Sequence, residues 1–194
     1  MLIPFLNAIV AATFLALCAQ AQAGMQEGID AGKNGNYAIA EKEFSQLADN
    51  GDATTQYNLG LMYDYGQGVP RNDNLALTWY RKAAIQGHAK AQFRLGVMYD
   101  TGQGAARNYK AALSWYRKAA KQGNTDAQNN LGVMYSNGQG VRTNLVQAHM
   151  WFSLAAASGN EVAIRNKDSV EEKMSPRQIE LAQELARNWP TKNQ

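Results

Sequence analysis

The sequence predicts an all-α solenoid, that is, a stack of similar helix–turn–helix repeats rather than a globule with one core. The main observation is a period of 36 residues. It relates three residue types that each occur three times, at Gly60, Gly96 and Gly132, at Tyr63, Tyr99 and Tyr135, and at Trp79, Trp115 and Trp151. Such self-similarity is typical of repeat proteins, in which each unit contacts only its neighbours. Because these stacks present an extended surface for a partner, we expect a binding protein.

The second observation is the spacing of apolar residues within the middle repeat, residues 89–123. In its first half, Ala91 and Leu95 lie one helical turn apart and begin an apolar face. Its second half has the same helical spacing at Ala112, Trp115, Tyr116, Ala119 and Ala120. Between the halves, Gly102 and Gly104 interrupt the helix and permit positive φ. Each repeat is therefore predicted to be a helical hairpin.

The recurrent tryptophan is predicted to pack against the recurrent glycine of the first helix. A glycine in mid-helix costs about 1 kcal/mol relative to alanine, so Gly96 is expected to make room for a bulky ring. Because truncating a buried tryptophan costs about 3–5 kcal/mol, we expect Trp115→Ala to destabilise the chain by that amount. The aromatic residues are interpreted as core, with ligand stacking as the alternative.

Residues 1–23 have the pattern of a cleaved signal peptide. The stretch from Leu2 to Ala21 carries no charge, and it ends in the small-x-small motif Ala21-Gln22-Ala23. Cleavage there would release a periplasmic or secreted chain that begins at Gly24 and has no membrane span. An uncleaved anchor is the competing interpretation, although the apolar run is short for a span of about 20 residues. Cys18 is the only cysteine, so the mature chain is expected to have no disulfide.

A degenerate repeat is predicted before the three strong ones. One period upstream, Phe44 takes the position of Tyr80, and Gly24 takes that of Gly60. Signal cleavage would remove the start of its first helix, so a short helix is expected in front of a second one over residues 37–50. A terminal repeat needs a polar outer face because no unit covers it.

The segment after the third repeat is predicted to cap the stack. Residues 161–174 are expected to form one helix. Ser175 and Pro176 open another, with serine as the N-cap and proline at the first helical position. The apolar residues of this second helix share one face, namely Ile179, Ala182, Leu185, Ala186 and Trp189. The second helix of the third repeat is less polar than its counterparts, so we expect the tail to pack on it.

The repeated residues also carry a family resemblance. The run A-x-x-x-LGxMYxxGxGVxxNxxxAxxWYxKAAxQG, in register three times between Ala53 and Asn160, resembles the Sel1-like repeat, a relative of the tetratricopeptide repeat. The resemblance implies a right-handed α-solenoid with first helices on the concave face and second helices on the convex face. It also implies an adaptor or scaffold role, here of a bacterial exported type. The organisation is then a signal peptide (1–23), a degenerate repeat (24–52), Sel1-like repeats (53–88, 89–124 and 125–160), and C-terminal capping helices with a tail (161–194).

Catalytic chemistry is not expected from the sequence. His88 takes a loop position, and His149 takes a position that is leucine in the other repeats, so both are interpreted as structural. No His, Cys or carboxylate cluster has metal-ligand spacing, so we expect no metal and no cofactor. The Gly66-Gln67-Gly68 turn and its copies lack the third glycine and the lysine of nucleotide loops. Some Sel1-like proteins that are rich in cysteine are associated with penicillin-like compounds, a remote alternative here because the paired cysteines are absent.

Charge gives no reason to expect a nucleic-acid partner. The formal net charge is +3, and no long basic run occurs. The densest basic groups, Arg81-Lys82 and Arg117-Lys118, are one period apart and are interpreted as the solvated face of a repeated helix.

The candidate partner-binding residues are first-helix positions that vary between repeats. They precede the recurrent Leu-Gly pair and comprise Tyr57, Asn58, Phe93, Arg94, Asn129 and Asn130. On a concave face they would form a stripe of aromatic, amide and cationic side chains, of which Tyr and Arg commonly anchor interfaces. A protein or peptide partner is expected, with envelope polysaccharide or peptidoglycan as the alternative. Ordinary solvated positions remain a third interpretation.

Overall fold

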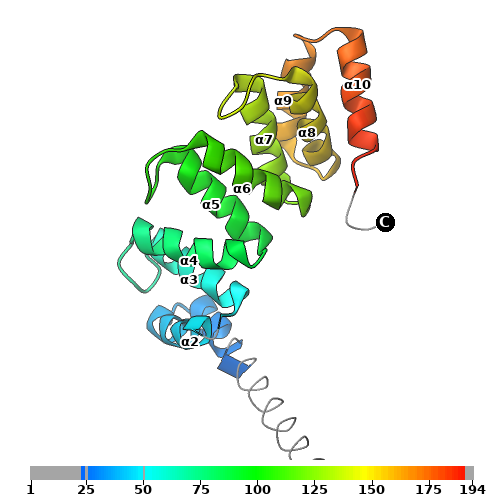
Figure 1. Cartoon of the computed structure of the whole chain (residues 1–194). Helices are drawn as coiled ribbons and strands as arrows, with labels where there is room; N and C mark the ends of the chain where they lie inside the picture. Colours follow the sequence, from blue (N-terminus) through cyan, green and yellow to red (C-terminus); the bar gives the residue numbers. More distant parts are fainter. Residues whose placement is uncertain (1–22, 25, 50, 191–194) are drawn as a thin grey trace, which may run out of the picture. The chain divides into compact units, whose positions relative to one another are not determined.

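The computed structural model describes residues 23–24, 26–49 and 51–190. All regular secondary structure within these ranges is helical (Figure 1). Most of the predicted signal peptide, residues 1–22, lies outside them. The chain divides into two compact units, residues 1–79 and 80–194, and helix α4 (Asp73–Ile85) crosses the boundary.

The first unit holds the degenerate repeat and the start of the first strong one. A helical segment at residues 26–33 is followed by α2 (Tyr37–Asp49) and α3 (Ala53–Tyr65), which pack against each other. The core of this unit consists of small and medium apolar side chains around one aromatic ring, namely Ala31, Ala40, Phe44, Ala48, Leu59 and Met62.

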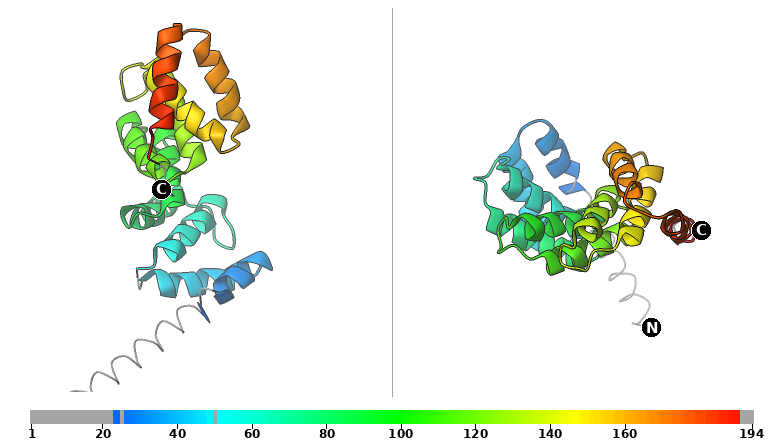
Figure 2. Two further views of the ribbon diagram at one scale, coloured as in Figure 1. Left: turned by 90° about the vertical axis from the view of Figure 1, so that its right-hand side faces the viewer. Right: turned by 90° about the horizontal axis from the view of Figure 1, so that it is seen from above.

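The second unit is a stack of helices in chain order. Its helices are α5 (Ala89–Thr101), α6 (Tyr109–Lys121), α7 (Thr125–Asn137), α8 (Leu145–Ala157), α9 (Glu161–Glu171) and α10 (Pro176–Arg187). From α5 to α9 each helix packs on the next, and α10 packs on α8 (Figure 2). The contacts between successive helices are those of a solenoid, so the prediction of an all-α helical-repeat fold is confirmed.

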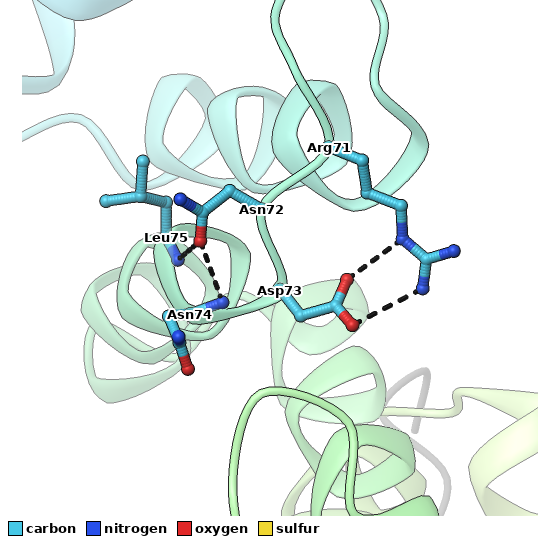
Figure 3. Close-up of polar contacts among 5 residues, drawn as sticks. All are labelled: Arg71, Asn72, Asp73, Asn74 and Leu75. Atoms are coloured by element: carbon cyan, nitrogen blue, oxygen red, sulfur yellow. Dashed lines mark hydrogen bonds and ion pairs between the residues drawn. The ribbon is translucent and has the colours of Figure 1, made fainter.

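The loop within each repeat uses one glycine to end a helix and one asparagine to begin the next. Gly66 ends α3 in the left-handed conformation, with φ of 67°. The Asn72 side chain accepts hydrogen bonds from two backbone N–H groups in the first turn of α4, at 3.1 Å each, beside an ion pair between Arg71 and Asp73 (Figure 3). The glycine and asparagine roles recur at Gly102 and Asn108 and at Gly138 and Asn144.

In two of the strong repeats, the ring that packs over the mid-helix glycine belongs to the residue after the tryptophan. A Cβ atom on Gly96 would lie 2.5 Å from the Tyr116 ring, and one on Gly132 would lie 2.4 Å from the Phe152 ring. Tyr116 is fully buried, whereas Trp115 is half-buried with Lys118 Nζ 3.9 Å from its ring centroid. The prediction that tryptophan fills this space was wrong. Consecutive helical residues point about 100° apart, and the tyrosine is the one that points at the first helix.

The degenerate repeat has the predicted pair of helices but a different register. Gly28 takes the glycine position, because its Cβ atom would lie 2.5 Å from the Phe44 ring. The prediction for Gly24 was wrong. Gly28 precedes Phe44 by 16 residues, whereas Gly96 precedes Tyr116 by 20. The loop at Gly35 is therefore four residues shorter than those of the strong repeats, and a strict period cannot detect that change.

The C-terminal helices begin as predicted, and the tail packs on α8 as expected. Ser175 caps α10 in a capping box with Gln178. Helix α9 ends at Glu171, three residues before its predicted end, because residues 172–174 form the turn into α10. The Trp189 ring meets Trp151 edge-on, with centroids 4.6 Å apart. This contact helps to make Trp151 more buried than Trp115.

Successive repeats in the second unit are joined by a repeated Arg–Tyr hydrogen bond. Arg81 in α4 donates to the Tyr99 hydroxyl at 2.6 Å, and one period later Arg117 in α6 donates to the Tyr135 hydroxyl, also at 2.6 Å. The Arg117 guanidinium also lies 5.6 Å from the Tyr135 ring centroid. Arg81, Lys82 and Lys118 are exposed and Arg117 is half-buried, as expected of a solvated helix face, and each arginine also contacts the next first helix.

Candidate functional site

Each unit has a groove between successive first helices. The N-terminal groove, of about 310 Å³, is lined by Gly28, Ile29, Gly32, Lys33, Ala40, Phe44, Asn58, Leu61, Met62 and Gln67. The C-terminal groove, of about 230 Å³, is lined by Val133, Ser136, Asn137, Phe152, Asn166, Ser169, Val170 and Lys173. The first groove lies between residues 26–33 and α3, and the second lies between α7 and α9.

The two grooves occupy the same place in their repeats. Phe44 and Phe152, three periods apart, are the aromatic side chains that line them. One wall consists of Asn58, Leu61 and Met62 in the first unit and of Asn166, Ser169 and Val170 in the second, again three periods apart. The same groove therefore recurs in two repeats, where two first helices lie side by side over a second-helix ring.

The side chains that line the grooves give them different chemistry. Ile29, Leu61 and Met62 make the N-terminal groove largely apolar. The C-terminal groove has hydroxyl and amide groups from Ser136, Asn137, Asn166 and Ser169 instead. Each groove also includes one exposed lysine, Lys33 or Lys173. The first groove suits an apolar side chain, and the second suits groups that donate and accept hydrogen bonds.

Among the six predicted partner-binding residues, Asn58 lines a groove. It lies on α3 together with half-buried Tyr57. Phe93 and Arg94 on α5 are also half-buried, and the Phe93 ring lies 5.9 Å from that of Tyr116. Phe93 therefore packs against the core and is also partly exposed at the surface.

Asn129 and Asn130 both make internal hydrogen bonds. Asn166 of α9 donates to the Asn129 side chain at 2.9 Å, which joins the walls of the C-terminal groove. Asn130 hydrogen-bonds to the buried Tyr116 hydroxyl. Sequence variation alone could not separate these residues from groove residues such as Val133 and Asn137. The missed signal was the position of Val133 and Asn137, one and five residues after the recurrent Gly132, where side chains flank the ring packed on that glycine.

Tyr116 of α6 and Asp100 of α5 form a hydrogen-bonded pair. The Tyr116 hydroxyl donates to the Asp100 carboxylate at 3.3 Å. Burial, together with the negative charge of Asp100, raises the pKa of Tyr116 well above its usual value of 10.0. Burial also raises the pKa of Asp100 above 3.8. The tyrosine therefore stays neutral at physiological pH, as suits a structural hydrogen-bond donor.

A serine, a histidine and a carboxylate come together between α8 and α9. His149 is 1% exposed, its Nε2 atom lies 2.6 Å from a Glu171 carboxylate oxygen, and its Nδ1 atom lies 3.3 Å from Ser153 Oγ. A hydrolase would need this group beside a substrate pocket, yet none of its members lines either groove. The contacts attach α9 to α8. His88 is structural as well, since its ring caps α5 by accepting from the Ala91 N–H at 3.2 Å.

Within the described ranges, no three His, Cys, Asp or Glu side chains are placed to hold a metal ion. No helix among those residues combines the length and hydropathy that a membrane crossing requires.

Comparisons with known proteins agree with this architecture. The Sel1 repeat model matches residues 53–88, 89–124 and 125–160. A Sel1 repeat protein from Oxalobacter formigenes is 33% identical, with a TM-score of 0.75 over 87% of this chain and 73% of that one. The protective antigen c5321 of uropathogenic Escherichia coli strains, which displays an SLR fold, is 27% identical, with a TM-score of 0.62 over 87% of this chain and 45% of that one.

A third solved structure, cysteine rich protein B of Helicobacter pylori, shares the fold. It is 23% identical, with a TM-score of 0.50 over 64% of this chain and 94% of that one. A comparison with curated protein sequences finds no match. Since the family model matches three successive repeats, which cover more than half of the sequence, the chain belongs to the Sel1 repeat family.

Proposed function

We propose that this chain is a non-catalytic scaffold that holds a protein partner through the grooves between its first helices. Proteins with Sel1 repeats are generally protein-interaction scaffolds. The observation that carries the proposal is the recurrence of one groove in two repeats with different linings. A repeat that keeps the groove but changes its side chains is suited to recognising different residues of a partner.

The size of the grooves favours side chains of a protein over a complete small molecule. Small-molecule sites usually measure about 300–1,000 Å³, and the grooves, at about 310 and 230 Å³, lie at or below that lower end. In the proposed complex an apolar partner residue occupies the N-terminal groove. Polar groups of the partner bind to Asn137, Asn166 and Ser169 in the C-terminal groove.

Blocking the C-terminal groove is expected to weaken partner binding at least about tenfold. Ser169 is exposed and lines the groove, so Ser169→Trp fills that space without removing a core contact. The partner is first captured with a photo-crosslinking residue at position 136, identified by mass spectrometry, and then titrated against purified variants. Helical content and the unfolding midpoint should stay unchanged.

The matched control is Ser114→Trp, which adds the same ring at an exposed position of α6. If Ser114→Trp weakens binding and Ser169→Trp does not, the partner uses the second helices. Crosslinking to glycan with no protein captured would favour envelope polysaccharide or peptidoglycan as the ligand.

We also propose that the scaffold is exported to the periplasm or secreted after cleavage behind Ala23. The support is the uncharged apolar run that ends at Ala21-Gln22-Ala23. Intact-mass analysis of the exported protein should give a chain that begins at Gly24. A species that retains Met1, or one that carries lipid on Cys18, would contradict the proposal.

A further inference from the structure

A glutamine side chain closes the interface between two repeats in the second unit. The Gln122 Nε2 atom, at the end of α6, donates to the Gly87 carbonyl at 2.8 Å and to the Gln92 Oε1 atom at 2.8 Å. Gln92 itself is 4% exposed and donates from Nε2 to the Ala84 carbonyl at 3.1 Å. One carboxamide thus supplies two hydrogens to two acceptors at the repeat boundary.

The equivalent interface one period later lacks this carboxamide. Gln128 takes the place of Gln92 and makes the same bond, from Nε2 to the Ala120 carbonyl at 3.2 Å. Ser158 takes the place of Gln122, and its short side chain instead contacts the Leu154 carbonyl at 3.5 Å. Among the described residues, the Gln128 Oε1 atom has no hydrogen-bond partner, although Gln128 is only 6% exposed.

Ser158 and Gln128 both line a cavity of about 440 Å³. Gln128 lines this cavity with Gly123, whose carbonyl is one period after that of Gly87. Leu154, Trp189 and Pro190 supply apolar walls. Leaving a buried acceptor unpaired costs free energy, so a ligand that brings an N–H donor into this cavity gains that contribution.

We propose that this cavity binds a primary carboxamide of the kind that a glutamine side chain carries. Its amide hydrogens donate to Gln128 Oε1 and to the Gly123 carbonyl, as Gln122 does one repeat earlier, while its methylene groups pack on Trp189. Lys121 also lines the cavity, and its positive charge disfavours an ammonium or guanidinium ligand. A carboxylate has no hydrogen to donate. The site is separate from both grooves, so it does not rest on the proposed function.

The test is a titration of the full chain, labelled with ¹⁵N, with N-acetylglutamine N-methylamide. The indole signal of Trp189 and the side-chain amide signal of Gln128 should shift in a saturable way, with a dissociation constant on the order of 1 mM for so small a probe. N-acetylglutamate N-methylamide, in which a charged carboxylate without a hydrogen to donate replaces the side-chain carboxamide, should bind at least about tenfold more weakly.

A pair of variants locates the binding. Ser158→Gln restores the residue type found one period earlier and should abolish the shifts, because its own carboxamide would donate to Gln128 Oε1 in place of the probe. Ser114→Gln, at an exposed position of α6, should leave them unchanged. Equal binding of the glutamate probe, or shifts that persist in Ser158→Gln, would overturn the proposal. Absence of any shift would mean that water alone occupies the cavity, which would overturn it too.

Discussion

Replacing Tyr116 by alanine is expected to destabilise the second unit by about 3–5 kcal/mol, the usual cost of truncating a large buried aromatic side chain. The ring is fully buried and fills the space over Gly96. Its hydroxyl also bonds to Asp100 and Asn130, so the change removes two polar contacts as well. Chemical denaturation followed by circular dichroism measures the loss.

Trp115→Ala is the matched control, because it truncates the neighbouring aromatic residue on the same helix. Trp115 is half-buried, and the Lys118 ammonium group lies over its ring. Truncating it should therefore lower the free energy of unfolding by only about 1 kcal/mol, a typical value for point substitutions. A double-mutant cycle with Gly96→Ala adds a second check. The added Cβ atom should cost about 1–3 kcal/mol beside tyrosine and much less beside alanine. Equal losses for Tyr116→Ala and Trp115→Ala would contradict the assignment of the packed ring.

Gln92→Leu is expected to cost about 2–3 kcal/mol, because an unsatisfied buried group costs about 1–3 kcal/mol. Leucine has a similar volume but neither donates to the Ala84 carbonyl nor accepts from Gln122. Gln128→Leu is the comparison, since Gln128 makes the bond to Ala120 but its Oε1 atom has no partner among the described residues. Thermal unfolding of both variants should show that Gln128→Leu costs about 1 kcal/mol less. An equal loss would mean that the Gln92–Gln122 contact adds no stability.

The repeated loops and helices could be predicted because their determinants are local. Gly66 and Asn72 act through their own backbone conformation and their own capping bonds, so their spacing is visible in the sequence. Local sequence could not show which of Tyr116 and Trp115 is the more buried. Both are large aromatic residues at successive positions of α6, and only the packing of α6 against α5 decides which ring is buried.

The candidate site was predictable only in part. Variation between repeats selected Asn58, which lines the N-terminal groove. It also selected Asn129, whose hydrogen bond to Asn166 depends on α9 lying beside α7. The recurrent Gln56, Gln92 and Gln128 were visible in the sequence as well, but their bonds reach the carbonyl group eight residues upstream, which requires the preceding helix to be in place.

The Arg–Tyr bond between repeats has an evolutionary consequence. Because Arg81 binds to Tyr99 in the same way as Arg117 binds to Tyr135, residues 89–124 form a cassette whose two edges match each other. A tandem duplication of this cassette would place the arginine of one copy opposite the tyrosine of the next, so the same bond could form at every junction. The same duplication of residues 125–160 would place Ser153, not arginine, opposite the next tyrosine and would expose Trp151, which Trp189 now covers. In this array, duplication of the interior cassette keeps the Arg–Tyr bond, whereas duplication of residues 125–160 does not.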